Sequence, residues 1–330
     1  NALVFFEKSQ WQYKFSPRLG FSHVITDKAT FTFNYGIYYQ TPVYENIYLN
    51  TNRQSEPEEL FEESAGYIGN ASMTSARTQA YEFAFNVQIG NNWGLTMGAW
   101  VKDMDQLSTY RFQMSGVFEY MVASSGDFGR ASGIDITLQN RGQLVNTMIQ
   151  YTYSKAKANG SYAQSAFGGQ YVDAPQQEYT MPFDRPHDIT VTMYSMLPFG
   201  INASVTGMYQ SGFPYTPVIF SGDKPQSDEK NRYTERSEAY RMVNMSFSKY
   251  LKLGGNKFHM GLNIFNVLDL KNDINIYPLT GNADDPGDYY TQDIALPADD
   301  GTISSAYYDR PWYYSSAREI NFFVQVEIGK

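Results

Sequence analysis

The run Tyr81-Glu82-Phe83-Ala84-Phe85-Asn86-Val87-Gln88-Ile89 carries an aromatic or aliphatic side chain at every odd position. Successive side chains of a β-strand point to opposite faces, so this alternation predicts a strand with one apolar face. The same period recurs at 11–25, 31–37, 95–102, 134–139, 145–154, 188–193, 201–206, 243–248, 258–264 and 320–328. No comparable stretch has the period of an amphipathic helix. The sequence therefore predicts a nearly all-β chain of about eleven strands.

The connections between these strands alternate between short and long. Five are tight and contain Gly, Asn, Asp or Pro, which supply the backbone angles that turns require: 26–28, 91–94, 141–143, 198–200 and 254–256. The other five are long and rich in Tyr, Ser, Gly, Asp and Pro: 40–76, 105–128, 156–185, 212–236 and 270–317. In an up-and-down sheet this order places every tight turn at one end and every long loop at the other.

Composition excludes several classes of protein. The chain of 330 residues contains 22 Phe and 28 Tyr, which argues against disorder, and no Cys, which excludes disulfides and thiolate zinc sites. A net charge of −9 argues against a nucleic-acid surface. The acids concentrate in two long loops, at 45–63 and 284–300. No basic segment of a signal peptide opens the chain at Asn1, so we expect either that one was removed or that longer polypeptide precedes this residue.

A soluble β-sandwich also alternates, but three features favour a membrane barrel. The strands are long enough for a tilted crossing of about ten residues. Their second face is small and polar, as in a hydrated lumen, whereas the outer face of a sandwich is usually charged. Short turns at one end and long loops at the other are typical of bacterial outer-membrane barrels. A sheet in lipid must close, and an antiparallel closure needs an even number of strands, so eleven strands predict that others precede Asn1.

Five segments resemble TonB-dependent outer-membrane receptors, in the order that the family shows. They are FSPRLGF at 15–21, YGIYYQTP at 35–42, PFDRPHD at 182–188, YQSGFPYTP at 209–217 and NIFNVLD at 263–269. The likeness is greatest to the Oar-like receptors of Bacteroidetes-type bacteria, which carry a carboxypeptidase-regulatory-like domain before the plug. One departure is the end of the chain, Glu327-Ile328-Gly329-Lys330, where such barrels usually finish on an aromatic residue.

The resemblance implies a Gram-negative outer-membrane location with the long loops extracellular. It implies that residues 1–330 are the C-terminal half of a 22-stranded barrel, with the plug domain and TonB box in polypeptide outside this sequence. The implied function is uptake of a large or scarce ligand through a plugged barrel. The implied partners are outer-membrane lipid, the chain's own plug and first half-barrel, the TonB complex, and a surface lipoprotein, with no nucleic acid. Two alternatives remain open: a barrel that serves surface or secreted proteins as a structural partner, and a passive porin.

The long loops hold the candidate ligand-binding residues. The family implies ligand capture by such loops, and Tyr44, Glu45, Tyr48 and Tyr215 are the residues we select; the two tyrosines of loop 40–76 can stack on a sugar or a peptide. The alternative is that these rings pack the loop against its neighbours. Clustered carboxylates at turns can bind Ca²⁺, which makes Asp284, Asp285 and Asp288 a hypothetical calcium site. Their spacing does not match an EF-hand loop, and solvated acidic turns are the favoured explanation. No other cofactor is predicted.

The sequence predicts no enzyme. Its three histidines, His23, His187 and His259, lie on separate predicted strands. His187-Asp188 near Ser195 could be imagined as part of a hydrolytic set, but no G-x-S-x-G nucleophile elbow accompanies them. We expect His187 to begin a strand and Ser195 to lie in the barrel wall.

Overall fold

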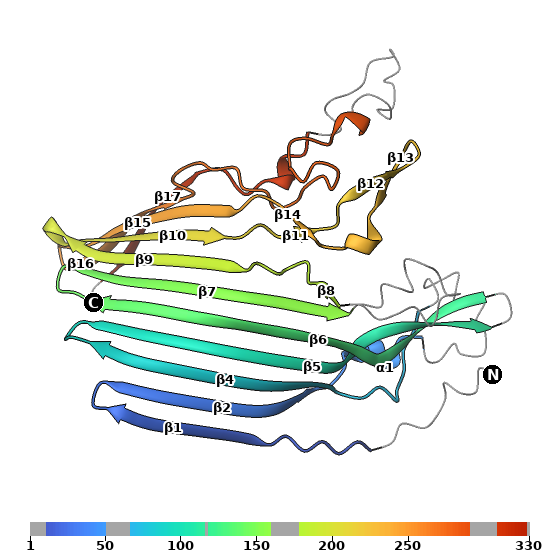
Figure 1. Ribbon diagram of the computed structural model, residues 1–330. Helices are drawn as coiled ribbons and strands as arrows, with labels where there is room; N and C mark the ends of the chain where they lie inside the picture. The colour runs from blue at the N-terminus through green and yellow to red at the C-terminus, as the bar shows by residue number, and fades with distance from the viewer. Residues whose placement is uncertain (1–10, 51–66, 116–117, 160–177, 291–308, 329–330) are drawn as a thin grey trace, which may run out of the picture.

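The computed structural model describes residues 11–50, 67–115, 118–159, 178–290 and 309–328. Eleven strands follow one another in an antiparallel sheet, each paired with the next (Figure 1). In chain order they are β1 (Arg18–Thr26), β2 (Ala29–Gln40), β4 (Ala76–Ile89), β5 (Trp93–Ser115), β6 (Phe118–Arg141), β7 (Val145–Asn159), β9 (His187–Leu197), β10 (Ile201–Gln210), β15 (Tyr240–Leu253), β16 (Asn256–Phe265) and β17 (Glu319–Glu327). The predicted number and order of strands are confirmed, and the fold class is the all-β wall of a barrel.

The remaining elements are short and lie among the long connections. Helix α1 (Tyr44–Tyr48) and β3 (Tyr67–Ile68) follow β2, and β8 (Glu178–Thr180) precedes β9. Between β10 and β15, β11 (Pro214–Tyr215) pairs with β14 (Glu235–Arg236), and β12 (Val218–Ser221) pairs with β13 (Lys224–Ser227). No helix in the described part of the chain is long and apolar enough to cross a membrane.

All five tight turns gather at one end of the sheet, and the long connections gather at the other (Figure 1). The turn between β15 and β16 shows how its sequence permits a tight hairpin. Leu253 pairs with Asn256, so only Gly254 and Gly255 connect the strands, and their φ angles are 56° and 85°. Two positive φ angles match the twist of a two-residue hairpin, and glycine adopts them without steric cost.

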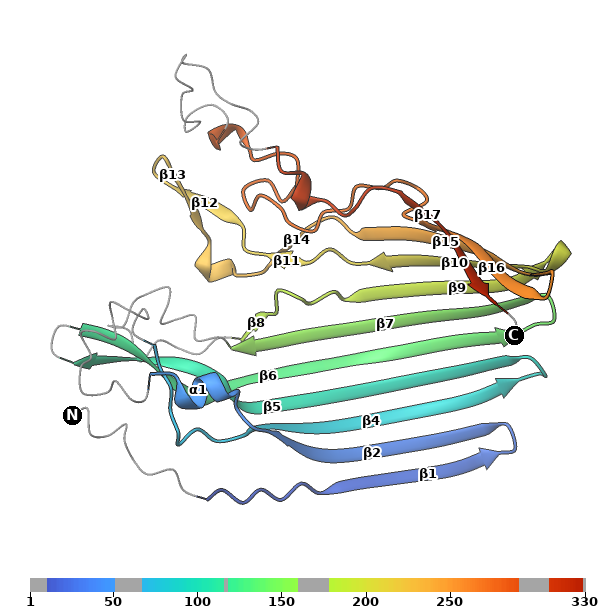
Figure 2. The same ribbon diagram turned by 180° about the vertical axis from the view of Figure 1, so that it is seen from behind.

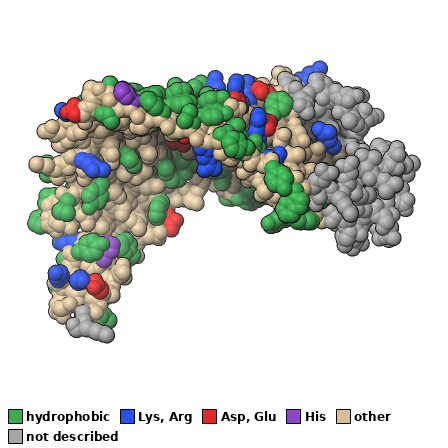
Figure 3. Space-filling view, turned by 90° about the horizontal axis from the view of Figure 1, so that it is seen from below, with side chains coloured by type: hydrophobic (Ala, Val, Ile, Leu, Met, Phe, Trp, Pro, Cys, Tyr) green, Lys and Arg blue, Asp and Glu red, His purple; other side chains and the backbone are tan. Residues whose placement is uncertain are grey.

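The strand register shows that the alternating apolar and polar residues form two separate faces of the sheet. On β5, Leu95, Met97 and Ala99 share one face with Ile136 of β6 and Phe85 of β4. The sheet curves into an arch, and hydrophobic side chains line its convex edge (Figure 3). The opposite, concave face carries the small polar residues, which line hollows of about 480 and 360 Å³. This division is the one expected of a barrel with lipid outside and water inside.

The sheet remains open, because β1 and β17 each pair on one side only in the described part of the chain. Apolar side chains continue to both edges, with Phe21 of β1 and Phe322 of β17 exposed. An unpaired row of backbone N–H and C=O groups has no satisfactory partner in lipid. The described strands therefore form part of a barrel wall and not a closed barrel.

Two predicted boundaries are wrong. The opening strand begins at Arg18 and not at Trp11, because Pro17 lacks the N–H that the ladder requires there. The segment 105–128 is not a loop: β5 and β6 continue through it and pair to their ends, except for residues 116–117, which lie outside the described residues. The register shifts between Met104 and Leu107, where Gln106 has φ 57°, so this irregularity breaks the alternation and hides the strand from a test of period.

This extended β5–β6 hairpin supports a small core beyond the barrel wall. Strand β3 pairs with β6 in parallel, Tyr67 opposite Met121 and Ile68 opposite Val122. The buried apolar residues here include Ile68, Met73, Val122 and Ala123. The hairpin therefore supports residues 67–73 and helix α1, which lies beside the loop-side parts of β5 and β6 (Figure 2).

Candidate functional site

The concave face carries a polar cluster that spans β4, β5, β6 and β7. The indole Nε1 of Trp100 donates to Asp135 Oδ2 at 2.8 Å, and Thr152 Oγ1 donates to Asp135 Oδ1 at 2.7 Å. Lys102 Nζ lies 4.0 Å from Glu82 Oε1 and 5.3 Å from the centre of the Trp100 ring. All of these residues except Thr152 line the 360 Å³ hollow. Charged and hydrogen-bonding groups that face a lumen are available to a polar occupant.

The candidate residues Tyr44, Glu45 and Tyr48 lie together on α1. Tyr44 and Tyr48 are 78% and 62% exposed, and their ring centroids are 6.1 Å apart. Residues four apart on a helix share a face, so this single turn presents both rings to the same side. Glu45 is exposed beside them. The arrangement is a short aromatic platform with one carboxylate.

The platform is fixed by residues that sequence reasoning did not select. Tyr110 of β5 donates its hydroxyl to Asn46 Oδ1 at 2.7 Å, and its ring meets Tyr67 edge-on at 5.0 Å. The backbone N–H of Asn70 donates to the carbonyl of Asn46 at 2.8 Å. Burial, followed by the charge of Glu45, raises the pKa of Tyr110. No local signal links Tyr110 to Asn46, because 64 residues separate them.

Replacing Tyr110 with Phe should loosen α1 without removing the ring. The lost hydrogen bond contributes about 1 kcal/mol, so exchange of the Leu49 and Asn70 amides should rise about fivefold in hydrogen–deuterium exchange. Tyr67→Phe is the matched control, because it removes the hydroxyl of the neighbouring ring and leaves the Asn46 contact in place. Equal exchange in the two variants would show that the Tyr110 hydroxyl does not hold the helix.

Tyr215 belongs to a different part of the site. It lies on β11, and a Cβ added to Gly281 would come within 2.2 Å of its hydroxyl oxygen. Burial and Glu235 raise its pKa. Tyr215 therefore packs closely against the loop that follows β16.

The acidic loop after β16 is held by its own turns. Asp285 Oδ1 accepts the N–H of Gly287 at 2.9 Å, and Thr280 Oγ1 donates to the carbonyl of Asp285. Asp284 and Asp288 are exposed. In the described residues, no three His, Cys, Asp or Glu side chains are placed to hold a metal ion. The calcium hypothesis for Asp284, Asp285 and Asp288 stays a prediction without geometric support.

The surroundings of Asp273 predict that this loop responds to pH. Its burial raises the pKa of its carboxyl, with further contributions from Glu238 and Asp284, against one lowering hydrogen bond from the Ala283 backbone. Because the folded loop prefers the protonated carboxyl, it is most stable at pH values below the ordinary pKa of aspartate. This stability is lost as the pH rises through the raised pKa of Asp273. Asp273→Asn should therefore protect the 270–285 amides more than wild type at pH 7, with a smaller difference at pH 4, in exchange corrected for intrinsic rates.

Asp269 provides a control of opposite sign. The backbone N–H of Arg318 donates to its carboxylate at 2.8 Å and lowers its pKa. The stability that the Asp269 carboxylate contributes is present at pH values above the ordinary pKa of aspartate. It is lost as the pH falls through the lowered pKa of Asp269. Asp269→Asn should thus reduce protection at pH 7. If Asp273→Asn and wild type differ in amide protection by the same amount at pH 7 and pH 4, titration of Asp273 does not control the loop.

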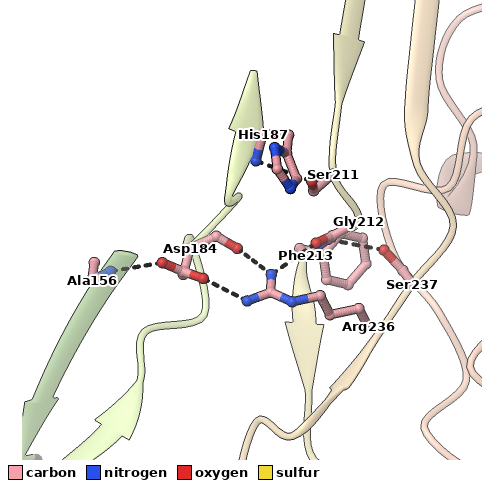
Figure 4. A network of polar contacts seen from close by, with 8 residues as sticks. All are labelled: Ala156, Asp184, His187, Ser211, Gly212, Phe213, Arg236 and Ser237. Carbon is pink, nitrogen blue, oxygen red and sulfur yellow. Dashed lines mark hydrogen bonds and ion pairs between the residues drawn. The ribbon is translucent and has the colours of Figure 1, made fainter. Parts of the chain in front are cut away.

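A polar network joins the loop ends of β7, β9 and β10 (Figure 4), and the sequence did not predict it. Arg236 Nη2 donates to Asp184 Oδ2 at 2.5 Å, while its Nη1 donates to the carbonyls of Asp184 and Gly212 at 2.7 and 3.1 Å. Asp184 Oδ1 accepts the N–H of Ala156 at 2.7 Å. The Asp184 side chain is 3% exposed and that of Arg236 33%. A carboxylate so buried needs this full set of partners.

His187 and Ser195 are too far apart to act together. His187 is the first residue of β9, where its Nδ1 lies 2.9 Å from the Tyr151 hydroxyl and its N–H donates to Ser211 Oγ. Ser195 Oγ donates to the Leu144 carbonyl at the other end of the same strand. Eight steps of about 3.4 Å separate the two residues by roughly 27 Å. His187 thus begins a strand and Ser195 lies in the wall, as predicted.

An open antiparallel wall with an apolar convex face, a polar concave face and loops at one end defines a class, the barrels of the outer-membrane type. The family described as "TonB dependent receptor-like, beta-barrel" matches residues 4–267. The chain belongs to this family. No curated protein sequence matches it. The finer likeness to Oar-like receptors of Bacteroidetes stays a prediction.

Solved structures of low identity share the fold. The outer membrane transporter YddB from Escherichia coli has a TM-score of 0.60 at 14% identity, over 94% of this chain and 40% of that one. FpvA of P. aeruginosa, bound to a pyoverdine–iron complex, gives 0.55 at 9%, over 95% and 32%. The FrpB iron transporter from Neisseria meningitidis gives 0.52 at 12%, over 78% and 35%. The chain thus spans about a third to two fifths of the length of these structures.

Proposed function

We propose that this chain is part of the barrel of a TonB-dependent transporter in the outer membrane of a Gram-negative bacterium, with its long loops extracellular. The observation that carries the proposal is the two-faced, open wall: apolar toward lipid, polar toward a lumen, in a chain of this receptor family. The ligand would be large or scarce and come from outside the cell. Iron and the pyoverdine–iron complex, named for two neighbours, are ligands of that kind.

The free edges of β1 and β17 are proposed to pair with further strands of the same protein. An even total is required for antiparallel closure, and a second set of eleven would complete a 22-stranded barrel. A plug domain would fill the lumen and meet the polar cluster around Asp135 and Lys102. A TonB box on that missing part would receive energy from the inner membrane.

The extracellular platform of α1 supports a role in ligand capture. Tyr44 and Tyr48 are exposed and share one face, and the hydrogen bond from Tyr110 to Asn46 anchors the helix that carries them, so the platform loses little freedom when a ligand binds. Tyr215 is proposed to act indirectly, by holding the acidic loop. We also propose a surface lipoprotein over these loops as a partner, and copurification tests this.

The first test combines two measurements on native protein extracted from the outer membrane in detergent. Denaturing mass spectrometry should find a mass well above 37.6 kDa and peptides that precede Asn1. Binding to the purified periplasmic domain of TonB should be measurable in the same preparation. A mass near 37.6 kDa with no TonB binding would refute the transporter proposal and favour a porin or a two-chain barrel.

A further inference from the structure

The apolar band on the convex face ends sharply on the side of the long loops. Outward positions of β5 are apolar from Trp93 to Val101 and then become Asp103. Eight steps of about 3.4 Å, tilted by roughly 40°, give a height of about 21 Å, slightly less than the ~25 Å of an outer-membrane apolar band. On β7 the outward aromatic residues Tyr151 and Tyr153 are followed by Lys155 and Lys157. This change marks the level of the lipid headgroups on the loop side.

Three cations meet at this limit on neighbouring strands. Arg130 of β6 lies directly opposite Lys157 of β7, and Lys155 lies opposite Ser132, one outward position nearer the band. All three are exposed. Like charges directly opposite each other in a sheet are destabilising, so the arrangement favours an anion that can lie between them.

The carboxylates nearby compensate only part of this charge. Arg130 Nε donates to Asp103 Oδ1 at 2.6 Å, and the charge of Glu178, opposite Asn159, also acts on Arg130. Neither Lys155 nor Lys157 has a carboxylate within 4.0 Å among the residues that the structure describes. Lys155 Nζ instead lies 5.7 Å from the centre of the Tyr153 ring, at the top of the aromatic row.

An apolar hollow lies below the cations and includes one of them. Its volume is about 310 Å³, and it is lined on the convex side by Ala99, Val101, Ile134, Tyr153, Ser132 and Lys155. The small side chains of Ala99 and Ser132 leave space between the larger ones. A hollow that is apolar below and cationic at its upper rim matches an acyl chain attached to an anionic headgroup.

We propose that this face binds one phosphorylated lipid of the outer leaflet. Its phosphate would lie among Arg130, Lys155 and Lys157, and one acyl chain would lie in the hollow beside Ile134 and Tyr153. The hollow favours a lipid over free phosphate, because an inorganic ion would leave the apolar half of the site unused. The inference rests on the proposed membrane placement of the convex face but not on transport.

The test is native mass spectrometry of the detergent-purified native protein, titrated with dioleoyl phosphatidic acid. One tightly bound lipid is expected, with dioleoyl phosphatidylcholine weaker. The double variant Lys155→Gln/Lys157→Gln should lower the phosphatidic acid affinity about 30-fold, since each surface cation contributes about fivefold. Lys249→Gln/Lys252→Gln, at the turn end of β15, is the matched control with the same loss of charge and should bind as wild type.

A second variant tests the apolar half. Ala99→Phe fills the hollow and leaves every cation in place, so it should weaken phosphatidic acid binding by about tenfold. Unchanged lipid affinity in Lys155→Gln/Lys157→Gln, or an equal loss in the control pair, would overturn the site. Displacement of the lipid by millimolar inorganic phosphate would also overturn it, in favour of an anion site. TonB binding is measured separately, so a failure of the lipid site and a failure of the transporter proposal can be distinguished.

Discussion

Replacing Asp184 with Ala should destabilise the loop ends of β7, β9 and β10 by about 2–3 kcal/mol. The substitution removes the partner of Arg236 and leaves the N–H of Ala156 without its acceptor. Breaking a fully buried ion pair costs about 3–5 kcal/mol, and the 33% exposure of Arg236 reduces that cost because water can solvate the freed guanidinium. Hydrogen exchange should rise at 156–159, 184–187 and 211–213, with the barrel strands unchanged below these levels.

The matched control is Asp105→Ala. Asp105 also pairs with an arginine at the loop end of the sheet, Arg77 Nη2 at 2.7 Å, but both side chains are about two-fifths exposed. Exposed pairs contribute about 0–1 kcal/mol, so this variant should change exchange little. If Asp105→Ala and Asp184→Ala have equal effects, the buried network does not hold the loops together.

Replacing Met97 with Arg should lower the stability of the protein in bilayers by about 2–4 kcal/mol. Met97 faces outward at the middle of the apolar part of β5, residues 93–101, between Phe85 and Ile136. A cation at the lipid-facing midplane of a barrel carries this cost because it leaves water for hydrocarbon. Reversible unfolding of the vesicle-inserted protein in guanidinium measures the difference.

Thr96→Arg, one residue earlier, is the internal control. Thr96 faces the concave side, where its hydroxyl donates to Asn86 Oδ1 at 2.8 Å. A new arginine there enters the hydrated lumen, so the expected loss is limited to that hydrogen bond, about 1 kcal/mol. If the lumen variant is the more damaging of the two, the faces have been assigned the wrong way round.

The strands were predictable because their cause is local. Alternation in runs such as Tyr81–Ile89 specifies both the strand and the face that each side chain occupies, and Gly254-Gly255 specifies its turn. Prediction failed at Gln106, where an irregularity shifts the phase, and the strands beyond it are held by pairing with each other and with β3. Nothing in their own period indicates that support.

The candidate site divides in the same way. That Tyr44 and Tyr48 lie in an exposed loop followed from sequence, whereas their common face and their anchor on Tyr110 did not. The Asp184–Arg236 network joins residues 52 positions apart, within segments whose resemblance to a receptor family was visible but whose contacts were not.

By itself, the sequence determined the class of this protein: all-β, eleven strands, one face for lipid and one for water, in the wall of an outer-membrane type of barrel. Each of these properties depends on neighbours along the chain, through the period of two and the backbone angles of the turns. Only the tertiary structure decided which strands extend past the barrel wall, which loop side chains are buried as anchors, and where Arg130, Lys155 and Lys157 meet. Those outcomes depend on the register between distant strands. The energy of such contacts comes from pairs of segments far apart in the sequence, so no single segment predicts it.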